Sequence, residues 1–169
     1  MDWPEQISQA LKQNKVEIIA HVPDEVTGSL LGLLEADPAF TVICVTREEE
    51  GVALLAGAYL GGKRGALIFQ GSGLGNALNA LGSLAVAAQI PILLIISERG
   101  RRGEINPVQV PLGRATPQIL EALGIQAFWV SAQDDAADVV DSGARLTFST
   151  TLPVAVLLTP ALTGGKRWK

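Results

Sequence analysis

Short runs of apolar residues recur along the chain, and a longer stretch of mixed apolar and polar residues separates each run from the next. Continuous apolar runs of this length are typical of strands that are buried on both faces of a sheet. The predicted strands are residues 16–21, 40–45, 65–70, 91–96, 126–130 and 153–158. Because helices are predicted between them, the pattern indicates an α/β fold with three layers, α/β/α, around a six-stranded, mostly parallel sheet.

Signals for the ends of helices occur between the predicted strands. Asp2 and Pro4 predict the cap and first turn of a helix that runs to about Asn14. Asp24 is a candidate cap for a second helix, which ends near Pro38. The other predicted helices are residues 48–61, about 76–89, a helix that begins at Thr116–Pro117, and 134–149. We expect residues 1–163 to form one domain and residues 164–169 to be a flexible tail.

Polar residues follow the first four predicted strands at the points where these strands end. These polar segments are His21–Asp24, Thr46–Glu50, Gln70–Asn76 and Ser97–Arg102. In parallel sheets, ligands bind beyond the carboxyl ends of the strands, so the four segments are the candidate site. Loops at strand ends are polar in many proteins, so the coincidence favours a site without identifying its ligand.

Three adjacent glutamates, Glu48, Glu49 and Glu50, begin a predicted helix that is otherwise apolar on every side. Such a helix is normally buried, and an ionised carboxylate is almost never buried without a partner. Consecutive helical residues point about 100° apart, so the three side chains cannot all reach the same place. We therefore expect at most one of them to be the working group of a site.

The overall composition excludes several classes of function. The chain has 169 residues, is 48% hydrophobic and carries a net charge of −4, which argues against a general nucleic-acid-binding protein. Its single cysteine, Cys44, is expected to be a core thiol, and no spacing of His, Cys, Asp and Glu suggests a metal site. No leader segment or membrane span is expected, which predicts a cytoplasmic protein. The apolar excess suggests that another chain covers part of the surface.

Glycines at positions 71, 73 and 75 lie between the third predicted strand and the helix after it. Such a loop can bind phosphate through backbone N–H groups, and it can equally be a tight turn that allows close packing. A nucleotide-binding α/β domain that uses the Gly71–Gly75 loop, with Glu98 as a ribose acceptor, is therefore one alternative.

Two kinds of polar side chain near the strand ends have more than one interpretation. The only histidine, His21, is either a hydrogen-bonded residue at a strand end or a group that transfers protons. Arg99 and Arg102 lie in the loop after the fourth strand, where they are either solvated charges or ligands of an anionic substrate group.

Three segments, Val45–Gly51, Ala56–Leu60 and Ser72–Asn76, together resemble the pyrimidine-binding domain of thiamine-diphosphate enzymes. Among these enzymes the chain is most similar to the α subunits of sulfopyruvate decarboxylases and to the related phosphonopyruvate decarboxylases. The other matching segments are residues 22–24, 80–84, 95–97 and 110–116, so the resemblance spans nearly the whole chain in order. One departure is Gly71, where the family usually has Asn, and this leaves the role of that position open.

The resemblance implies a thiamine-diphosphate-binding fold and a role for several residues. Glu49 precedes Ala58–Tyr59 by the family's interval, which implies that it hydrogen-bonds N1′ of the aminopyrimidine ring and activates the cofactor. The further implied cofactor contacts are Pro23, Gly73, Leu74, Gly75 and Asn76. The candidate substrate contacts are His21, Asp24, Arg99 and Arg102.

The resemblance also implies an enzyme that is active only with a partner. The family binds the diphosphate and Mg²⁺ through a Gly-Asp-Gly segment of a second domain, and this segment does not occur in the sequence. A β subunit would therefore supply that domain, in an α₂β₂ or larger assembly in which this chain also associates with itself. The implied reaction converts sulfopyruvate to sulfoacetaldehyde and carbon dioxide. A phosphonopyruvate decarboxylase subunit is an alternative, because the sequence does not separate a sulfonate, a phosphonate or a simple 2-oxo acid substrate.

Overall fold

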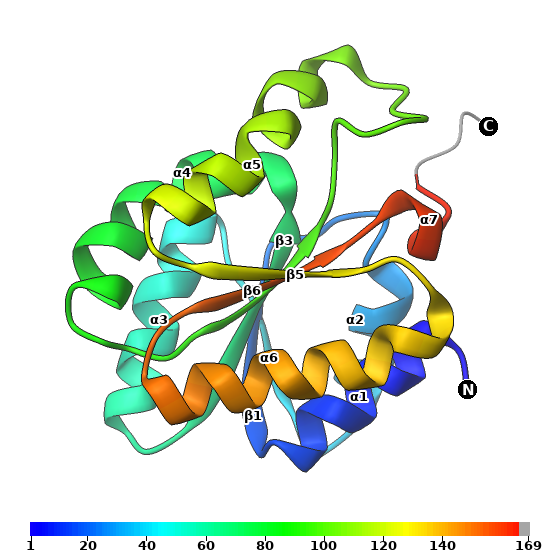
Figure 1. Cartoon of the computed structure of the whole chain (residues 1–169). Coiled ribbons are helices and arrows are strands. Elements are labelled where there is room, and N and C mark those ends of the chain that lie inside the picture. Colours follow the sequence, from blue (N-terminus) through cyan, green and yellow to red (C-terminus); the bar gives the residue numbers. More distant parts are fainter. Residues whose placement is uncertain (166–169) are drawn as a thin grey trace.

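Six parallel strands form one sheet in the order β2-β1-β3-β4-β6-β5 (Figure 1). The structure is a computed structural model, and it describes residues 1–165. The strands are β1 (Val16–His21), β2 (Thr41–Cys44), β3 (Arg64–Gln70), β4 (Leu93–Ser97), β5 (Gln126–Val130) and β6 (Val154–Leu158). Every neighbouring pair is parallel, which confirms the predicted parallel sheet.

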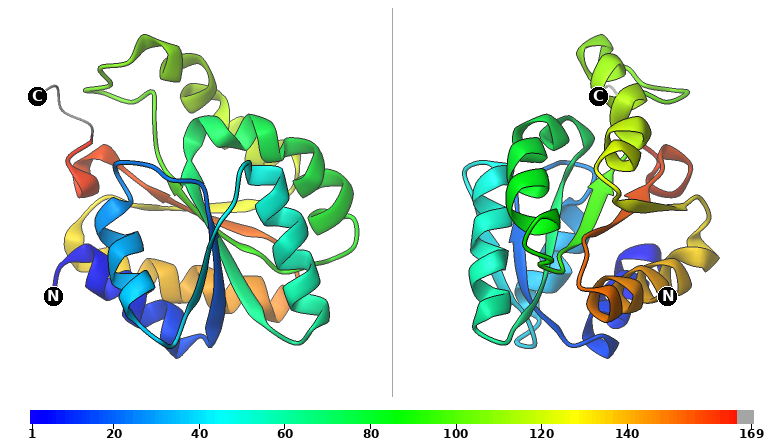
Figure 2. Two further views of the ribbon diagram at one scale, coloured as in Figure 1. Left: turned by 180° about the vertical axis from the view of Figure 1, so that it is seen from behind. Right: turned by 60° about the vertical axis from the view of Figure 1, so that its left-hand side comes forward.

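Helices cover both faces of the sheet, which confirms the three predicted layers (Figures 1 and 2). One face carries α1 (Trp3–Gln13), α2 (Gly28–Ala36) and α6 (Ala136–Thr150). The other face carries α3 (Glu48–Leu60), α4 (Leu74–Ala80) and α5 (Val110–Ala122). None of the helices in the described residues is long and apolar enough to cross a membrane.

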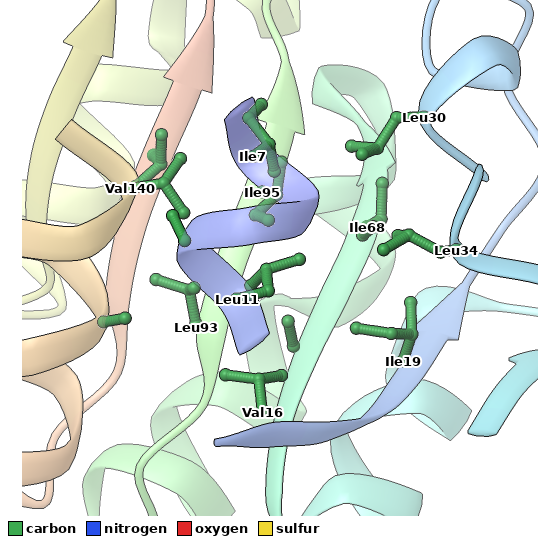
Figure 3. Close-up of a cluster of buried hydrophobic side chains, with 14 of the residues drawn as sticks. Ile7, Leu11, Val16, Ile19, Leu30, Leu34, Ile68, Leu93, Ile95 and Val140 are labelled. Atoms are coloured by element: carbon green, nitrogen blue, oxygen red, sulfur yellow. The ribbon is translucent and has the colours of Figure 1, made fainter. Parts of the chain in front are cut away.

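The packing of α1 shows how the sequence pattern produces a layer. Asp2 caps the helix by accepting a hydrogen bond from the backbone N–H of Glu5, whose carboxylate accepts one in return from the backbone N–H of Asp2. Ile7 and Leu11, four residues apart, lie on one side of α1 and are fully buried. They pack over the middle of the sheet beside Ile95 of β4 (Figure 3).

Two predicted helix starts are wrong. The second helix begins at Gly28, and the Asp24 side chain does not cap it but accepts a hydrogen bond from Ser97. α5 begins at Val110, so Pro117 lies inside the helix. A Thr-Pro pair often marks the start of a helix, but a helix can also contain a proline in its interior. The turn that leads into α5 is set by contacts with the preceding loop, where Gly113 approaches the backbone of Arg99.

Other differences are smaller. α4 continues into a π-helical segment, Leu81–Val86, where one uninterrupted helix was predicted. The structure adds the 3₁₀ turns Gly71–Gly73, Pro107–Gln109 and Gln133–Asp135 and a short final helix, α7 (Pro160–Thr163). The expectation of a core thiol is also wrong, because Cys44 ends the edge strand β2 and is exposed. Most of the predicted tail, residues 166–169, lies outside the described residues.

Candidate functional site

The candidate site lies at the carboxyl ends of β1, β3 and β4, which are neighbours at the centre of the sheet. The chain runs outward from β1 to β2 and then crosses back to β3 on the other side of β1. In parallel sheets, a crevice forms at the point where the strand order reverses, and ligands bind there. The sheet therefore brings the four predicted polar segments to one edge.

Glu48 is the buried member of the three glutamates, with a relative exposure of 6%. Its Oε2 accepts a hydrogen bond of 2.8 Å from Nδ2 of Asn76. Its Oε1 packs so closely against Gly73 that a Cβ added to that glycine would overlap it. Both oxygens of Glu48 are thus occupied by contacts within the chain, and the side chain fixes the glycine loop. The sequence pattern predicted at most one working group among the three glutamates, and burial alone singles out Glu48.

Glu49 lies at the open side of the first turn of α3, where its side chain is 37% exposed. Its Oε1 accepts a hydrogen bond of 2.6 Å from Nε of Arg47, and its Oε2 is buried without a hydrogen-bond partner among the described residues. Its own backbone N–H holds the pKa of the Glu49 carboxyl below its usual range, and Arg47 adds to this while desolvation opposes it. The carboxylate is therefore ionised at neutral pH and retains one oxygen that can accept a hydrogen bond.

Arg47 connects Glu49 of α3 with Asn76 of α4. Besides its bond to Glu49, its Nη2 donates to Oδ1 of Asn76 at 3.2 Å. Asn76 thus bridges Arg47 and the buried Glu48, so its side chain is fixed from both ends. The third glutamate, Glu50, accepts a hydrogen bond from the backbone N–H of Thr46, which closes the start of the helix.

The remaining implied cofactor residues lie around the same loop. Gly73 and Leu74 are buried, and the Leu74 side chain belongs to the apolar core, so only its backbone faces the loop. Gly75 and Pro23 are exposed, and an added Cβ on Gly75 would lie 3.3 Å from Leu112 of α5. The structure therefore brings Glu49, Asn76 and the glycine loop together, with Pro23 on the neighbouring turn after β1.

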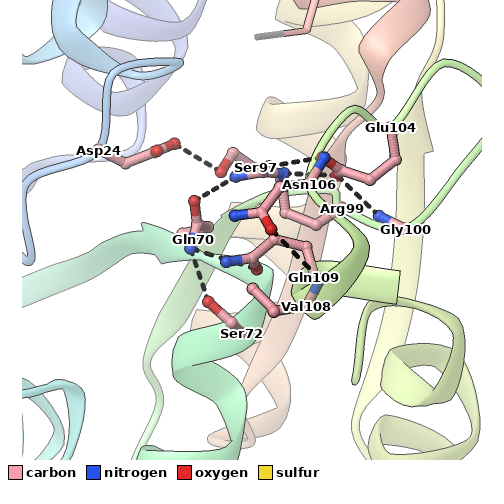
Figure 4. Close-up of polar contacts among 10 residues, drawn as sticks. All are labelled: Asp24, Gln70, Ser72, Ser97, Arg99, Gly100, Glu104, Asn106, Val108 and Gln109. Carbon is pink, nitrogen blue, oxygen red and sulfur yellow. Dashed lines mark hydrogen bonds and ion pairs between the residues drawn. The ribbon is translucent and has the colours of Figure 1, made fainter. Parts of the chain in front are cut away.

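A second polar cluster lies beside the glycine loop (Figure 4). Arg99 forms a bidentate ion pair with Glu104, in which Nε and Nη2 donate at 2.8 and 2.7 Å, and its Nη1 donates to Oε1 of Gln70. Gln70 Nε2 in turn donates to Oγ of Ser72 at 2.6 Å and to Oε1 of Gln109 at 3.4 Å. The cluster joins the end of β3, the end of β4 and the turn before α5.

Glu104 organises the loop that carries this cluster. It also accepts hydrogen bonds from the backbone N–H groups of Gly100 and Asn106. The Arg99 guanidinium and these two N–H groups lower the pKa of the Glu104 carboxyl to about 2, against the opposing effect of desolvation. Gln70 belongs to the predicted segment 70–76, whereas Glu104 and Gln109 were not predicted as site residues, because the segment after β4 has no periodicity that places them beside it.

The four predicted substrate residues fall into different environments. Asp24 accepts a hydrogen bond of 2.7 Å from Ser97 Oγ, which links the ends of β1 and β4. His21 is 5% exposed, its ring nitrogens have no hydrogen-bond partner among the described residues, and burial lowers its pKa. The Arg99 guanidinium is buried against Glu104, whereas Arg102 is exposed in the same loop.

The groups that a bound nucleotide would contact make other interactions in the structure. Glu98, the proposed ribose acceptor, already accepts hydrogen bonds from Arg101 and from the Trp129 indole. The buried carboxylate of Glu48 lies against Gly73, which disfavours a phosphate at this loop. No group of three or more His, Cys, Asp or Glu residues that could hold a metal ion occurs in the described part of the chain.

Comparison with known proteins agrees with this geometry. The family described as thiamine pyrophosphate enzyme, N-terminal TPP binding domain, matches residues 1–119. The chain is 39% identical over 158 residues to the sulfopyruvate decarboxylase subunit alpha of Methanococcus maripaludis, covering 94% of this chain and 95% of that protein. It is 43% identical over 107 residues to the phosphonopyruvate decarboxylase of Streptomyces viridochromogenes, covering 63% of this chain and 27% of that protein.

A solved structure supports the fold alone. It is the 2-oxoglutarate:ferredoxin oxidoreductase from Magnetococcus marinus, with 2-oxoglutarate, coenzyme A and succinyl-CoA bound. The match has a TM-score of 0.74 at 16% identity and covers 96% of this chain and 29% of that one.

Proposed function

The chain belongs to the family of N-terminal TPP-binding domains of thiamine pyrophosphate enzymes, and we propose that it is the α subunit of a sulfopyruvate decarboxylase. The proposed reaction converts sulfopyruvate to sulfoacetaldehyde and carbon dioxide with thiamine diphosphate as cofactor. Support comes from relatives named as alpha subunits of this enzyme, which match this chain over nearly its whole length.

The observation that carries the proposal is the buried Oε2 of Glu49, which has no partner among the described residues. A buried polar atom is normally satisfied, so an open one at a strand-end site is expected to receive a donor from a ligand. A protonated ring nitrogen of an aminopyrimidine is such a donor, so the residues present fit this cofactor. When bound, thiamine diphosphate supplies the electron sink for loss of carbon dioxide. Glu49 would accept the hydrogen bond at N1′, while its own backbone N–H lowers the pKa of its carboxyl and Arg47 adds to this and holds the carboxylate in place.

A partner subunit would supply the rest of the cofactor site. The sequence has no Gly-Asp-Gly segment, so we assign the diphosphate and Mg²⁺ to a β subunit that carries one. The outer side of α3 and α4 is the natural contact surface, because Leu60 and Leu78 are 82% and 38% exposed there. Glu49 lies at the start of this surface, which favours an α₂β₂ or larger assembly in which the cofactor is held between chains.

The substrate residues receive revised roles within this proposal. Asp24, held by Ser97, and the neutral His21 lie at the end of β1 and would line the substrate space. Arg102 is exposed in the loop and would attract the anionic substrate. Arg99 has its charge neutralised by Glu104, so we assign it to the loop's structure instead of to direct binding.

The test is decarboxylation by this chain co-expressed with a partner that carries Gly-Asp-Gly. We expect activity with sulfopyruvate from the complex, none from this chain alone, and weak binding of thiamine diphosphate and Mg²⁺ to this chain alone by calorimetry. Glu49→Gln should lower kcat about 10²- to 10⁴-fold and leave assembly intact. Glu50→Gln is the matched control, because Glu50 accepts a hydrogen bond from the backbone N–H of Thr46 at the helix start.

Two results would overturn the proposal. If Glu50→Gln or Glu48→Gln abolishes activity while Glu49→Gln is mild, the assignment of Glu49 is wrong. If the complex prefers phosphonopyruvate over sulfopyruvate in a competition assay, the phosphonopyruvate decarboxylase alternative replaces the proposed substrate.

A further inference from the structure

We propose that the Arg99–Glu104 ion pair is a positioning device that orients the Gln70 amide, so that Ser72 and Gln109 both present hydrogen-bond donors to an anionic group of the substrate. The inference rests on the proposed function and extends it to the recognition of the substrate's second anionic group. The residues concerned join β3, β4 and the start of α5 in one hydrogen-bonded chain (Figure 4).

The first step is the orientation of Gln70. A guanidinium group has only donors, so the Gln70 atom that faces Arg99 must be its amide oxygen. The Arg99 side chain is only 5% exposed, so water does not compete for this contact. The amide nitrogen of Gln70 is therefore turned toward the glycine loop.

The second step is the orientation of Ser72 and Gln109. Nε2 of Gln70 donates to both Ser72 Oγ and Gln109 Oε1, so each of these oxygens is used as an acceptor. The hydroxyl proton of Ser72 must then point away from Gln70, and so must the NH₂ group of Gln109. Both residues are half-buried, so part of each side chain stays accessible to a ligand.

The third step is that the ion pair holds these hydrogen-bond directions fixed. Glu104 stays ionised at every pH at which the enzyme would work, and it fixes Arg99 with two hydrogen bonds. The loop also lies tightly against α5, because a Cβ added to Gly113 would overlap the carbonyl oxygen of Arg99. The direction of the hydrogen bonds is therefore set by a buried charge pair and does not depend on the substrate.

These donors match one class of ligand. Carboxylate, sulfonate and phosphonate groups accept hydrogen bonds and have none to donate when fully ionised. Two neutral donors bind such a group without the desolvation cost of a free guanidinium. Figure 4 shows Gln70 between these donors and Ser97, which donates to Asp24 at the same end of the sheet.

Gln70→Glu in the complex with the partner subunit tests the inference. The new carboxylate keeps the contact to Arg99 but cannot donate, so Ser72 and Gln109 would turn their donors toward it and away from the substrate. We expect KM for sulfopyruvate to rise about 10- to 100-fold with little change in kcat. Affinity for the unreactive analogue 3-sulfolactate, measured by calorimetry, should fall by a similar factor. Gln118→Glu, on the exposed side of α5, is the control with the same change of charge.

The outcomes separate this inference from the proposed function. A wild-type complex that does not decarboxylate sulfopyruvate overturns the proposed function. An active wild type in which Gln70→Glu raises KM no more than Gln118→Glu overturns the inference about Gln70. If Gln70→Glu fails to assemble, Ser72→Ala and Gln109→Leu replace it, since each removes one donor. An unchanged KM for sulfopyruvate in both variants would also overturn the inference.

Discussion

Replacing Glu104 by Gln tests how much the buried ion pair contributes to stability. The side chains of Arg99 and Glu104 are only 5% and 7% exposed, so solvent screens this pair little. The substitution keeps the shape of the side chain and removes its charge. The two hydrogen bonds from Arg99 and those from the backbone of Gly100 and Asn106 then lose their charged acceptor.

The expected loss follows from the pKa of Glu104. Folding lowers it from an ordinary value of 4.5 to about 2. Each unit corresponds to about 1.4 kcal/mol, so the ionised carboxylate contributes about 3 kcal/mol to the free energy of unfolding at neutral pH. Because the folded-state pKa is the lower one, this contribution is complete above about pH 4.5 and is lost as the pH falls toward 2.

Urea denaturation of the full chain at several pH values between 7 and 3 measures this directly. Glu104→Gln should cost about 3 kcal/mol at pH 7, and its deficit relative to wild type should shrink as the pH falls below 4.5. Glu17→Gln is the matched control, because Glu17 is in an exposed ion pair with Lys63, and its loss should cost less than about 1 kcal/mol. Equal losses in the two variants, or a Glu104→Gln deficit of the same size at pH 7 and pH 3, would refute the reasoning.

Two further predictions address the glycine loop and the substrate loop. Gly73→Ala should lower the free energy of unfolding by about 1–3 kcal/mol, because the new methyl group displaces the Glu48 carboxylate from Asn76. Gly32→Ala, in an exposed helical position with nothing within 4 Å, should instead be neutral or stabilising, and the same denaturation experiment compares the two. Arg102→Ala should lower the ratio of kcat/KM for sulfopyruvate over pyruvate about tenfold with unchanged stability, because it removes an exposed charge that attracts the more anionic substrate. A ratio equal to that of wild type would remove Arg102 from substrate recognition.

The layers and strands of this fold could be predicted from the sequence, because the signals are local. Apolar runs mark β1 to β6, and the capping residues Asp2 and Glu5 mark the start of α1. The start of α5 could not be predicted in this way. Pro111 in the first turn and Pro117 inside the helix carry the same local signal, and the approach of Gly113 to the backbone of Arg99 joins residues that no periodic pattern connects.

Part of the candidate site could also be predicted from the sequence. The rule for parallel sheets places the polar segments at one edge, and the family's interval points to Glu49 among three identical residues. The burial of Glu48 depends instead on Asn76, which is 28 positions away in the sequence. The pairing of Arg99 with Glu104 and Gln70 likewise requires three segments to meet, so the sequence left Arg99 as either a solvated charge or a ligand of an anionic substrate group.

The position of β6 between β4 and β5 has a consequence for folding during synthesis. β1 to β4 are neighbours within the first 97 residues and can pair as soon as they emerge from the ribosome. β5 is made next but has no partner in that half-sheet, because its only neighbour in the described sheet is β6 at residues 154–158. The nascent chain therefore carries one unpaired strand and an open edge at β4 until residues 154–158 are added, and this unpaired stage is the one most exposed to aggregation.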